Sequence, residues 1–414
     1  MPENCGSVVH VLLDPADLRT TPAAYRARLA ALVRDSMAPW IAWSGSLFPI
    51  RTQRASYDAL TSAQGGIAPS ILCLAKCEMG NVAEPSWLSR FSSGLCVPWL
   101  WRRHALLDLL DTLQDPLPTP FYLPFQLALA MDPTAIAQAD LDGPVPIRPP
   151  TATLRARRDA LPHILPIVAA SVRRSRALSL PAQPPAISIA LCAYNEEERI
   201  AWAIASVLAQ SDRSWELLIV DDGSDDGTVA AARACTHSEP RVSLLRRSVN
   251  EGKAHALNQA LAAARGRFFL ELDADDWLPP HAIGSMRDAI ADSDNGVSLL
   301  TFDHFVWRRA RSGELLPRGI LPASAPLVTR RAARVPIPRL FRTGALRELG
   351  GWRTSDASGG RLFEDVAITR EVQHGGVVAQ HSGVLYHRVI RQSSVSQSHR
   401  RAYGPWAQSQ FPEM

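Results

Sequence analysis

Long apolar runs are missing from this sequence of 414 residues. No window approaches the roughly 18 consecutive apolar residues of a membrane-spanning helix, and the N-terminus lacks the basic and then apolar pattern of a secretory signal. We therefore expect neither an integral membrane protein nor a secreted one. The sequence predicts a soluble, cytoplasmic protein with at most peripheral membrane association.

Lysine is scarce, and the cysteines do not have the spacing of a zinc site. Of the 44 basic residues only Lys76 and Lys253 are lysines, and the net charge of +4 is not gathered in one tract, so nucleic-acid binding is not indicated. Cys73 and Cys77 are followed by no second Cys or His pair at zinc spacing. We expect the six cysteines to be reduced thiols, as in the cytoplasm.

The length exceeds the usual size of a single core, so two domains are expected. Two Pro-rich stretches, residues 142–150 and 181–185, bracket an Arg-rich segment that reads as helical, and they are the best linkers in the chain. The predicted organisation is an N-terminal accessory domain (1–150), an Arg- and Pro-rich helical linker (151–184), a catalytic domain (185–396) and a C-terminal tail (397–414).

Short aliphatic runs alternate with amphipathic segments of helical length after residue 185. Four strands and three helices are predicted in this order: strand Ile187–Leu191, helix Glu196–Ala209, strand Trp215–Val220, helix Thr228–Cys235, strand Val242–Leu245, helix Lys253–Ala264 and strand Phe268–Leu272. Such alternation predicts a parallel sheet with right-handed crossovers and a ligand crevice at the carboxyl ends of its strands.

Residues 1–150 show no clean alternation, and we expect a mixed α/β module there. One internal echo stands out, because residues 97–109 align without gaps on residues 337–349 with six of thirteen positions identical. Residues 30–49 loosely echo 262–279, but without the acids. Two interpretations remain open: chance similarity between two Leu- and Arg-rich segments, or a degenerate, partial copy of the catalytic module.

The most informative segment is an apolar strand that ends in acid, Phe268–Asp276. Alternate side chains of an extended chain share a face, so Asp273 and Asp275 are expected to point together beyond the strand end. Two carboxylates suit Mg²⁺ or Mn²⁺ with a phosphate as a further ligand. An ordinary solvated acidic turn is the alternative for this segment taken alone.

Polar motifs also follow the first two predicted strands. Ala193, Tyr194 and Glu196 stand after the first strand, and the acid- and Gly-rich run that begins with Asp221 and Asp222 stands after the second. A carboxylate at a strand end can accept the imide N–H of a pyrimidine. A calcium loop fails on register, because its terminal acid would fall on Arg233, whereas an ordinary turn remains possible.

A third motif opens the helix before the acidic strand. A helix N-terminus preceded by a flexible Gly252 and carrying Lys253 is a favourable site for an anion. The alternative is a solvated lysine.

Together these motifs resemble the family 2 glycosyltransferases of the GT-A fold. The resemblance implies a Rossmann-like, mainly parallel sheet flanked by helices, a nucleotide-diphospho-sugar donor, with UDP-sugars favoured, and Mn²⁺ or Mg²⁺. It implies that the donor is bound by Ala193, Tyr194, Glu196, Asp221, Asp222, Gly252, Lys253, Asp273 and Arg388. The metal ligands it implies are Asp273, Asp275 and His387.

The resemblance continues towards the C-terminus. Phe363-Glu364-Asp365 looks like the family's acidic pair, which implies that Asp365 is the general base and Glu364 its neighbour in the acceptor pocket. Residues 386–396 look like a closing basic and Ser-rich loop, in which Arg388 or Arg391 would touch the diphosphate and His387 would complete the metal sphere. The spacing of this loop is only approximate, so which residue is the ligand stays open.

The sequence thus predicts an inverting, metal-dependent glycosyltransferase of the hexosyltransferase type, since one displacement with one base inverts the anomeric centre. A catalytically silent nucleotide-sugar-binding scaffold and a nucleotidyltransferase are the alternatives, and the latter lacks its usual Gly-rich loop after the first strand. The acceptor is not encoded in a readable way: a saccharide, a lipid-linked sugar, a natural product and a peptide all remain open. Acceptor contacts are expected within residues 297–334, where Trp307 and several arginines lie.

Overall fold

The computed structural model describes residues 4–5, 8–12, 20–44, 71–75, 99–113, 116–131, 136–140, 152–173, 184–236, 239–293, 296–311, 313–329, 333–356, 358–391 and 402–411. The chain divides into two compact units. Unit 1 is Met1–Ser175 with Ala310–Leu316, and unit 2 is Arg176–Arg309 with Pro317–Met414. The Ser-rich part of the predicted closing loop, residues 392–396, lies outside the described residues.

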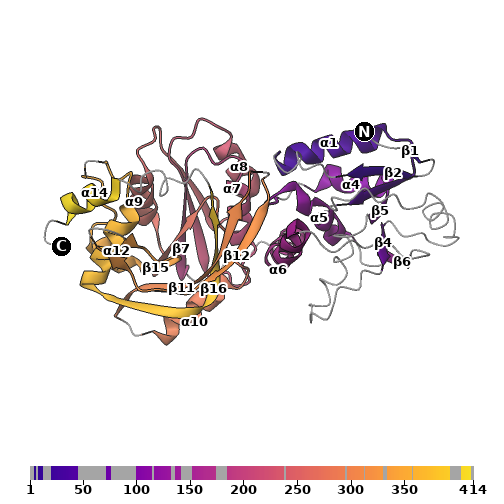
Figure 1. The fold of residues 1–414 in the computed structure, drawn as a ribbon. Helices are drawn as coiled ribbons and strands as arrows, with labels where there is room; N and C mark the ends of the chain where they lie inside the picture. Colours follow the sequence, from indigo (N-terminus) through magenta and orange to yellow (C-terminus); the bar gives the residue numbers. More distant parts are fainter. Residues whose placement is uncertain are drawn as a thin grey trace. The chain divides into compact units, whose positions relative to one another are not determined.

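Unit 2 is built on a mainly parallel sheet whose strand order is β12-β11-β15-β10-β7-β8-β9, with β16 paired to β11 (Figure 1). The strands are β7 (Ile187–Ala193), β8 (Trp215–Asp221), β9 (Val242–Arg246), β10 (Phe268–Asp273), β11 (Val297–Arg309), β12 (Leu315–Leu321), β15 (Arg339–Arg342) and β16 (Val377–Ile390). β10, β7, β8 and β9 are parallel to one another, whereas β15 runs antiparallel to both β10 and β11. The α/β fold class and the mainly parallel sheet are thereby confirmed.

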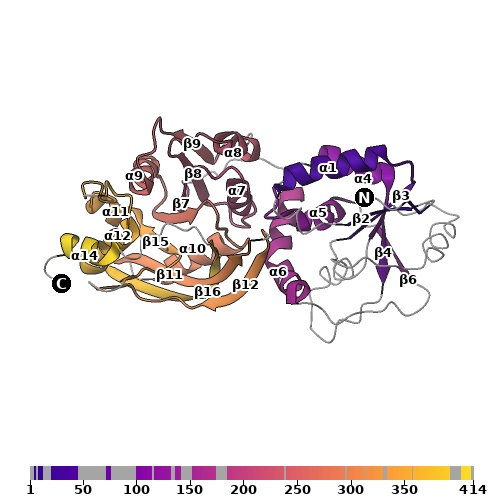
Figure 2. The same cartoon turned by 45° about the horizontal axis from the view of Figure 1, so that its top comes forward.

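Helices cover both faces of this sheet because nearly every residue of the central strands is apolar and buried (Figure 2). One face packs against α7 (Ile200–Leu208), α8 (Thr228–Thr236) and α10 (Ala282–Asp292), and the other against α9 (Lys253–Ala263), α11 (Thr343–Glu348) and α12 (Glu364–Gly375). The alternation of the pleat is visible in β7, where Ile189 packs into the first cluster and Ala190 into the second.

The predicted elements of this half are confirmed to within a residue or two, with one exception. The predicted helix Glu196–Ala209 begins only at Ile200. The cause is tertiary: Asn195 has a left-handed φ of 54°, and the backbone N–H of Glu196 donates to Thr228 Oγ1 at 2.8 Å. The segment before Ile200 is therefore held by the next loop and cannot start the helix.

The predicted C-terminal tail contains a helix, α14 (Tyr403–Gln410), that packs on unit 2. Tyr403 and Phe411 are buried in a small cluster with Val366 of α12. The ring of Phe363, directly before Glu364, lies edge-on to Tyr403 at 5.3 Å and contacts Trp406 at 4.9 Å between centroids. The tail thereby supports the start of α12.

Unit 1 is a mixed α/β unit, as expected, with the strand order β1-β2-β3-β5-β4-β6. Its strands are β1 (Asn4–Cys5), β2 (Val8–Leu12), β3 (Trp40–Ser44), β4 (Ile71–Ala75), β5 (Trp99–Arg102) and β6 (Ile136–Asp140). Its helices are α1 (Pro22–Asp35), α4 (Arg103–Thr112), the short η3 (Pro120–Tyr122), α5 (Leu123–Ala130) and α6 (Ala152–Arg173).

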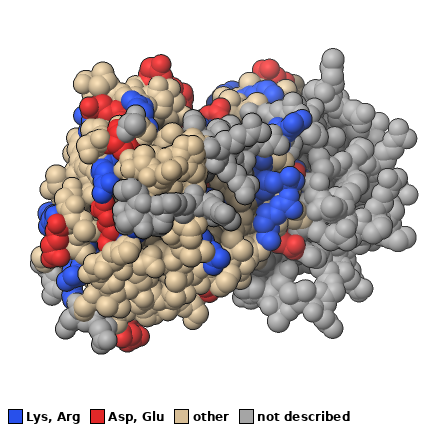
Figure 3. Space-filling model, turned by 60° about the vertical axis from the view of Figure 1, so that its left-hand side comes forward, with Lys and Arg blue, Asp and Glu red and all other residues tan. Residues whose placement is uncertain are grey.

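The segment expected as a helical linker forms α6, which packs on α5 inside unit 1. Leu161 and Leu165 of this helix are fully buried. Among the described residues, no helix combines the length and the apolar character that crossing a membrane requires. On the face of the molecule in Figure 3, acidic and basic side chains are interspersed.

Candidate functional site

The carboxyl ends of β7, β8 and β10 and the N-terminus of α9 meet at one edge of the unit 2 sheet. The register aligns Ala193 with Asp221, and Asp273 with Cys192, so the three strand ends lie level. This is the edge at which open parallel sheets bind ligands. The motifs predicted from the sequence therefore come together, although they are far apart in the chain.

The loops after β7 and β8 are joined by reciprocal hydrogen bonds. The N–H of Asn195 donates to Ser224 Oγ at 3.0 Å, and its side-chain oxygen accepts from the N–H of Asp225 at 3.1 Å. Ala193 is buried at the end of β7, and its carbonyl accepts from the N–H of Asp222 at 2.9 Å. Tyr194, by contrast, is 46% exposed and offers a free aromatic face beside the strand ends.

Asp221 and Asp222 are both buried but are engaged differently. Asp222 accepts from the backbone N–H groups of Gly252 at 2.7 Å and Glu251 at 3.2 Å, so its carboxylate holds the loop before α9. Burial raises the pKa of Asp222 despite these bonds. Asp221 Oδ2 has no hydrogen-bond partner, and the nearest cation is Arg246 Nε at 3.6 Å. Of the two, Asp221 is the one with an acceptor atom to spare.

Lys253, the first residue of α9, forms an ion pair with the acidic strand end. Its Nζ lies 2.5 Å from Asp273 Oδ1 and 3.9 Å from Glu271 Oε2. Burial alone would raise the pKa of Asp273, but the charge and hydrogen bond of Lys253 lower it to about 2. Gly252 has a φ of 103°, and a Cβ there would meet Arg361 Cγ at 2.8 Å, so this position requires glycine.

Asp275 and Glu196 are bridged by one arginine of the closing segment. The guanidinium of Arg391 lies 2.5 Å from Asp275 Oδ2 and 3.1 Å from Glu196 Oε1. Burial raises the pKa of Asp275 to about 6, and the charges of Asp273 and Glu196 add to the rise. Arg391 therefore neutralises only part of this acidic cluster. Arg388 is half-buried, and its charge contributes to lowering the pKa of Asp273.

Glu364 and Asp365 are the first two residues of α12. Burial and the neighbouring Asp365 charge raise the pKa of Glu364 to about 8, whereas the charge of Lys253 opposes the rise. Asp365 Oδ1 accepts from the N–H of Val366 at 2.8 Å. Phe363, at a left-handed φ of 59°, turns the chain sharply into this helix. With a pKa of about 8, Glu364 is protonated at pH 7.

His387 is buried in an aromatic stack. Its ring lies parallel to Trp277 with centroids 5.1 Å apart, and its Nδ1 accepts from Trp307 Nε1 at 3.0 Å. An Nδ1 that accepts places the proton on Nε2, which is not the form that binds a metal through Nε2. Trp307, which the sequence suggested as an acceptor contact, is fully buried here.

The described residues hold no group of three or more His, Cys, Asp or Glu side chains arranged to bind a metal ion. The two carboxylates of Asp273 and Asp275 are nevertheless the oxygen ligands that Mg²⁺ and Mn²⁺ use, and such ions take one or two carboxylates and complete their shell with phosphate and water. Burial and the like charges of Asp273 and Glu196 raise the pKa of Asp275, and a divalent cation would offset both effects. The donor set therefore fits an ion that arrives with a diphosphate.

Several supporting residues were missed in the sequence. Glu271, inside β10, forms a buried two-point ion pair with Arg339 of β15 at 2.7 and 3.1 Å. Asp276 is buried and accepts from Tyr386 Oη at 2.8 Å and from the N–H of Val389 at 2.7 Å, which ties the acidic loop to β16. A charged residue in the middle of an apolar strand was the available signal for Glu271.

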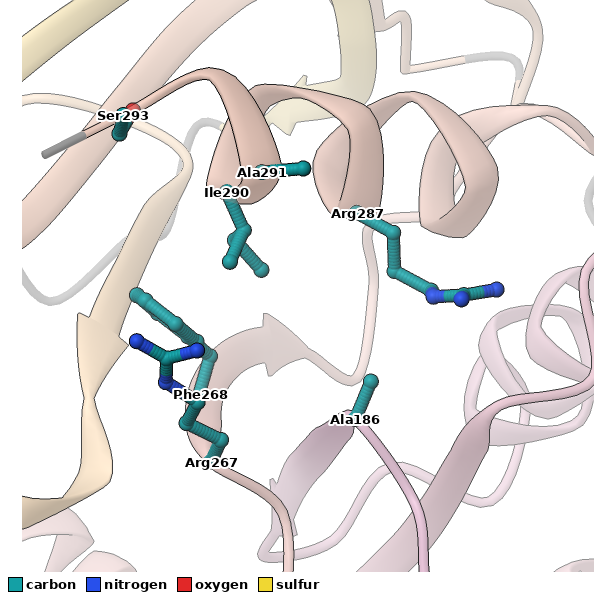
Figure 4. A pocket seen from close by; sticks show the side chains of 7 residues that line it. All are labelled: Ala186, Arg267, Phe268, Arg287, Ile290, Ala291 and Ser293. Carbon is teal, nitrogen blue, oxygen red and sulfur yellow. The ribbon is translucent and has the colours of Figure 1, made fainter. Parts of the chain in front are cut away.

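A separate cavity of about 250 Å³ opens at the opposite edge of the same sheet (Figure 4). It is lined by Ala186, Arg267, Phe268, Arg287, Ile290, Ala291 and Ser293, which lie at the amino ends of β7 and β10 and on α10. It contains none of the predicted site residues and no carboxylate. We therefore place the candidate site at the carboxyl edge.

Comparison with known proteins gives the class of this region. Residues 188–348 match the model for glycosyl transferase family 2. The matched part of the chain carries the strand ends and Lys253. The sequence-based resemblance is thereby confirmed.

The matches to individual relatives span only part of each relative's length. The chain is 30% identical over 190 residues to the putative glycosyltransferase EpsE of Bacillus subtilis, which is 44% of this chain and 65% of EpsE. It is 42% identical over 93 residues to WfgD of Escherichia coli, named a UDP-Glc:alpha-D-GlcNAc-diphosphoundecaprenol beta-1,3-glucosyltransferase, which is 22% of this chain and 36% of WfgD. The chain thus spans less than two thirds of each of these relatives.

Two solved structures are also similar. Staphylococcus aureus TarS 1–349 in complex with UDP-GlcNAc aligns with a TM-score of 0.40 and 20% identity over 51% of this chain and 60% of TarS. The mannosyltransferase PcManGT of Pyrobaculum calidifontis in complex with GDP-Man and Mn²⁺ aligns with a TM-score of 0.42 and 19% identity, over 64% of this chain and 76% of PcManGT.

Proposed function

We propose that this protein is an inverting glycosyltransferase that moves a sugar from a nucleotide-diphospho-sugar to a nucleophile on an unidentified acceptor. The observation that carries the proposal is the meeting of Asp221, Lys253 and Asp273 at the carboxyl edge of the sheet, within the residues that match the family. A hydrogen-bond acceptor for a nucleobase, a cation for a diphosphate and an acid for a metal or ribose then lie at one edge of the sheet.

A uracil base is favoured for the donor. The unpartnered Oδ2 of Asp221 accepts one hydrogen bond, which the imide N–H of uracil supplies. The exposed ring of Tyr194 offers a stacking surface close to it. WfgD, whose name specifies UDP-Glc, supports the same choice.

The diphosphate is proposed to lie between the N-terminus of α9 and the acidic strand end. Lys253 supplies a positive charge at a helix end whose dipole also favours an anion. Asp273 and Asp275 would hold Mn²⁺ or Mg²⁺, which neutralises the departing diphosphate. Arg391 now occupies the space between Asp275 and Glu196, so we expect it to turn towards the phosphates when the donor binds.

Asp365 is the proposed general base, and the neutral Glu364 its hydrogen-bonding neighbour. Asp365 accepts the proton of the acceptor nucleophile, whose oxygen forms the new bond to the anomeric carbon from the face opposite the diphosphate. The electrons of the broken bond leave with the diphosphate. Glu364, with a pKa of about 8, keeps its proton at pH 7 and is suited to donate a hydrogen bond to the acceptor.

The test is a donor and acceptor screen with the full chain. UDP-hexoses and Mn²⁺ are incubated with pooled saccharides, lipid-linked sugars, natural products and peptides, and products are detected by mass. A shift of one hexose or N-acetylhexosamine on an acceptor supports the proposal. Tight binding of UDP and Mn²⁺ without turnover on any acceptor would instead favour a silent nucleotide-sugar-binding protein.

A further inference from the structure

The sheet of unit 1 repeats part of the sheet of unit 2. In unit 1, β2 is parallel to β3, β3 is antiparallel to β5, β5 is antiparallel to β4, and β4 is parallel to β6. In unit 2, β7, β10, β15, β11 and β16 pair in the same order and with the same senses. The order along the chain is also the same, since β2, β3, β4, β5 and β6 correspond to β7, β10, β11, β15 and β16.

The helices follow the same correspondence. Four residues separate α1 from β3, and four residues separate α9 from β10. α4 follows β5 without a break, as α11 follows β15. α1 packs on α4, and α9 packs on α11. In each unit, therefore, the crossover helix before the second strand contacts the helix after the antiparallel strand.

One backbone hydrogen bond is shared at equivalent positions. The N–H of Arg103 donates to the carbonyl of Pro39 at 2.9 Å, and the N–H of Thr343 donates to the carbonyl of Arg267 at 3.0 Å. Each donor is the first residue of its helix, and each acceptor precedes the first residue of the parallel strand. The residues before the donors, Arg102 and Arg342, have nearly the same backbone angles, with φ/ψ of −63°/128° and −66°/120°.

An arginine from the second helix caps the first helix in both units. Arg103 donates to the carbonyls of Val33 at 3.1 Å and Arg34 at 3.0 Å, near the end of α1. Arg347 donates to carbonyls at the end of α9, those of Leu261 at 3.3 Å and Ala264 at 2.6 Å. Arg103 and Arg347 are not at equivalent positions of the alignment. Both nevertheless donate to backbone carbonyls at a helix C-terminus, where the carbonyls have no partner within the helix.

The sequence echo falls on these equivalent elements in the same register. Residues 97–109 span β5 and most of α4, and residues 337–349 span β15 and α11. The gap-free alignment pairs Leu100 with Leu340 and Leu106 with Leu346, and all four are fully buried. Topology, a shared hydrogen bond and sequence therefore agree on one alignment, which chance similarity of two helical segments does not explain.

The part that unit 1 lacks is the part that carries the donor motifs. In unit 2, residues 194–252 separate β7 from α9 and contain β8, β9 and the acids of the donor site. In unit 1, only residues 13–21 separate β2 from α1. Unit 1 also lacks an equivalent of the ion pair between Glu271 and Arg339. The two positions that correspond to them, which are likewise paired across neighbouring strands, hold Trp43 and Trp99.

We infer that unit 1 is a partial repeat of the glycosyltransferase unit that has lost the donor-binding half of its sheet, so that the chain has one nucleotide-sugar site. Unit 1 keeps the strands that correspond to β7, β10, β11, β15 and β16, and the helices that correspond to α9 and α11. It is a non-catalytic unit, and two tryptophans in register, Trp43 and Trp99, stand at the strand positions where the catalytic unit holds charge.

The correspondence is tested by grafting in the full chain. In the in-register graft, residues 97–109 are replaced by the residues found at 337–349. Trp99 is kept, because an arginine at that position would face Trp43 and not a glutamate. The six changes are Val97→Ile, Trp101→Phe, Arg103→Thr, His104→Gly, Leu107→Arg and Asp108→Glu. The matched control inserts the same segment one residue later, at 98–110, which moves every strand side chain to the opposite face.

Hydrogen exchange of the amides in residues 99–112 is the readout. We expect the in-register graft to keep their slow exchange and to lower the melting temperature by a few degrees, at roughly 2–4 °C per kcal/mol. The shifted graft should lose the protection. If both grafts lose protection, or both keep it, the alignment of the two units is wrong.

The loss of the donor half is tested by titrating the full chain with UDP and Mn²⁺. One mole of UDP per mole of chain, abolished by Asp275→Ala, is the expected result. Two moles of UDP per mole of chain would overturn the inference that unit 1 is free of donor. A single site that survives Asp275→Ala would instead contradict the proposed role of Asp275 in unit 2.

Discussion

The side-chain amide of Asn258 clamps the backbone of Trp352. Asn258 Nδ2 donates to the carbonyl of Trp352 at 2.7 Å, and its Oδ1 accepts from the N–H of the same residue at 2.8 Å. Asn258 lies on α9, whose first residue is Lys253, whereas Trp352 lies in the loop between α11 and α12, which leads to Glu364 and Asp365. The clamp therefore couples the proposed donor cation to the proposed base.

Asn258→Ala should lower kcat more than it raises the KM for the donor. Without the two hydrogen bonds the loop shifts against α9, and a misplacement of about 1 Å can cost on the order of 100-fold in rate. Steady-state kinetics with a nucleotide-sugar and its acceptor measure the split between kcat and KM.

The matched control is Gln210→Ala. Its amide likewise donates to two carbonyls, those of Ser206 and Pro279, and accepts from the N–H of Ile283, but it is buried away from the site. Both variants should lose comparable stability, about 1–3 kcal/mol. Equal losses of kcat in the two would show that Asn258 acts through stability alone.

Asp275→Ala should abolish metal-dependent donor binding. The substitution removes one of two carboxylates available to the metal and releases Arg391 from its ion pair. Calorimetric titration with UDP in the presence and absence of Mn²⁺ measures the effect. Asp212→Ala, which breaks a surface pair with Arg287, is the control and should bind as the native chain does. Unchanged Mn²⁺-dependent affinity in Asp275→Ala would exclude Asp275 as a ligand.

Asp365→Asn should spare donor binding and remove transfer. A positioned general base contributes roughly 10²- to 10⁴-fold, so the transfer rate should fall within that range while the affinity for UDP is kept. Glu364→Gln should retain much more activity, because Glu364 is already neutral at pH 7 and glutamine keeps a hydrogen-bond donor. Near-native transfer by Asp365→Asn would disprove the assignment of the base.

Stability should depend on the ionisation of Glu364. Its pKa is raised from 4.5 to about 8 in the folded chain, so the folded state holds a proton that the unfolded state releases above about pH 4.5. The free energy of unfolding contributed by this group therefore falls as the pH rises from about 4.5 to 8. Denaturant unfolding at pH 5 and pH 8 should show a smaller drop in Glu364→Gln than in the native chain. An identical pH dependence in both would contradict the raised pKa.

Arg339→Met should destabilise unit 2 strongly, because it leaves the Glu271 carboxylate buried without its partner. Breaking such a pair typically costs about 3–5 kcal/mol, whereas replacing both members with apolar residues is often neutral. Glu271→Met/Arg339→Met should therefore recover much of the loss. Denaturant unfolding of the two single variants and the double variant measures the coupling, and additive losses would show that the pair is not coupled.

Much of unit 2 was predictable from its sequence because its elements are local. The strand Trp215–Asp221 and the helix Lys253–Ala263 follow from short aliphatic runs, amphipathic spacing and a glycine before the helix. The start of α7 was not predictable, because Asn195 and Glu196 are held by the loop that contains Ser224 and Thr228, about 30 residues away.

By itself, the sequence determined which residues could carry the chemistry: parallel strand ends with acids, one helix N-terminus with Lys253, and an acidic pair at the start of a later helix. Only the tertiary structure decided how these groups are used. Asp222 binds the backbone of the loop before α9, whereas Asp221 keeps an oxygen without a hydrogen-bond partner. Glu364 is neutral at pH 7, and Asp275 forms an ion pair with Arg391. The reason is physical, since burial and the charges of residues distant in the chain set hydrogen bonds and pKa values. Strand pairing, likewise a tertiary property, turned a weak sequence echo into the inference of a repeat.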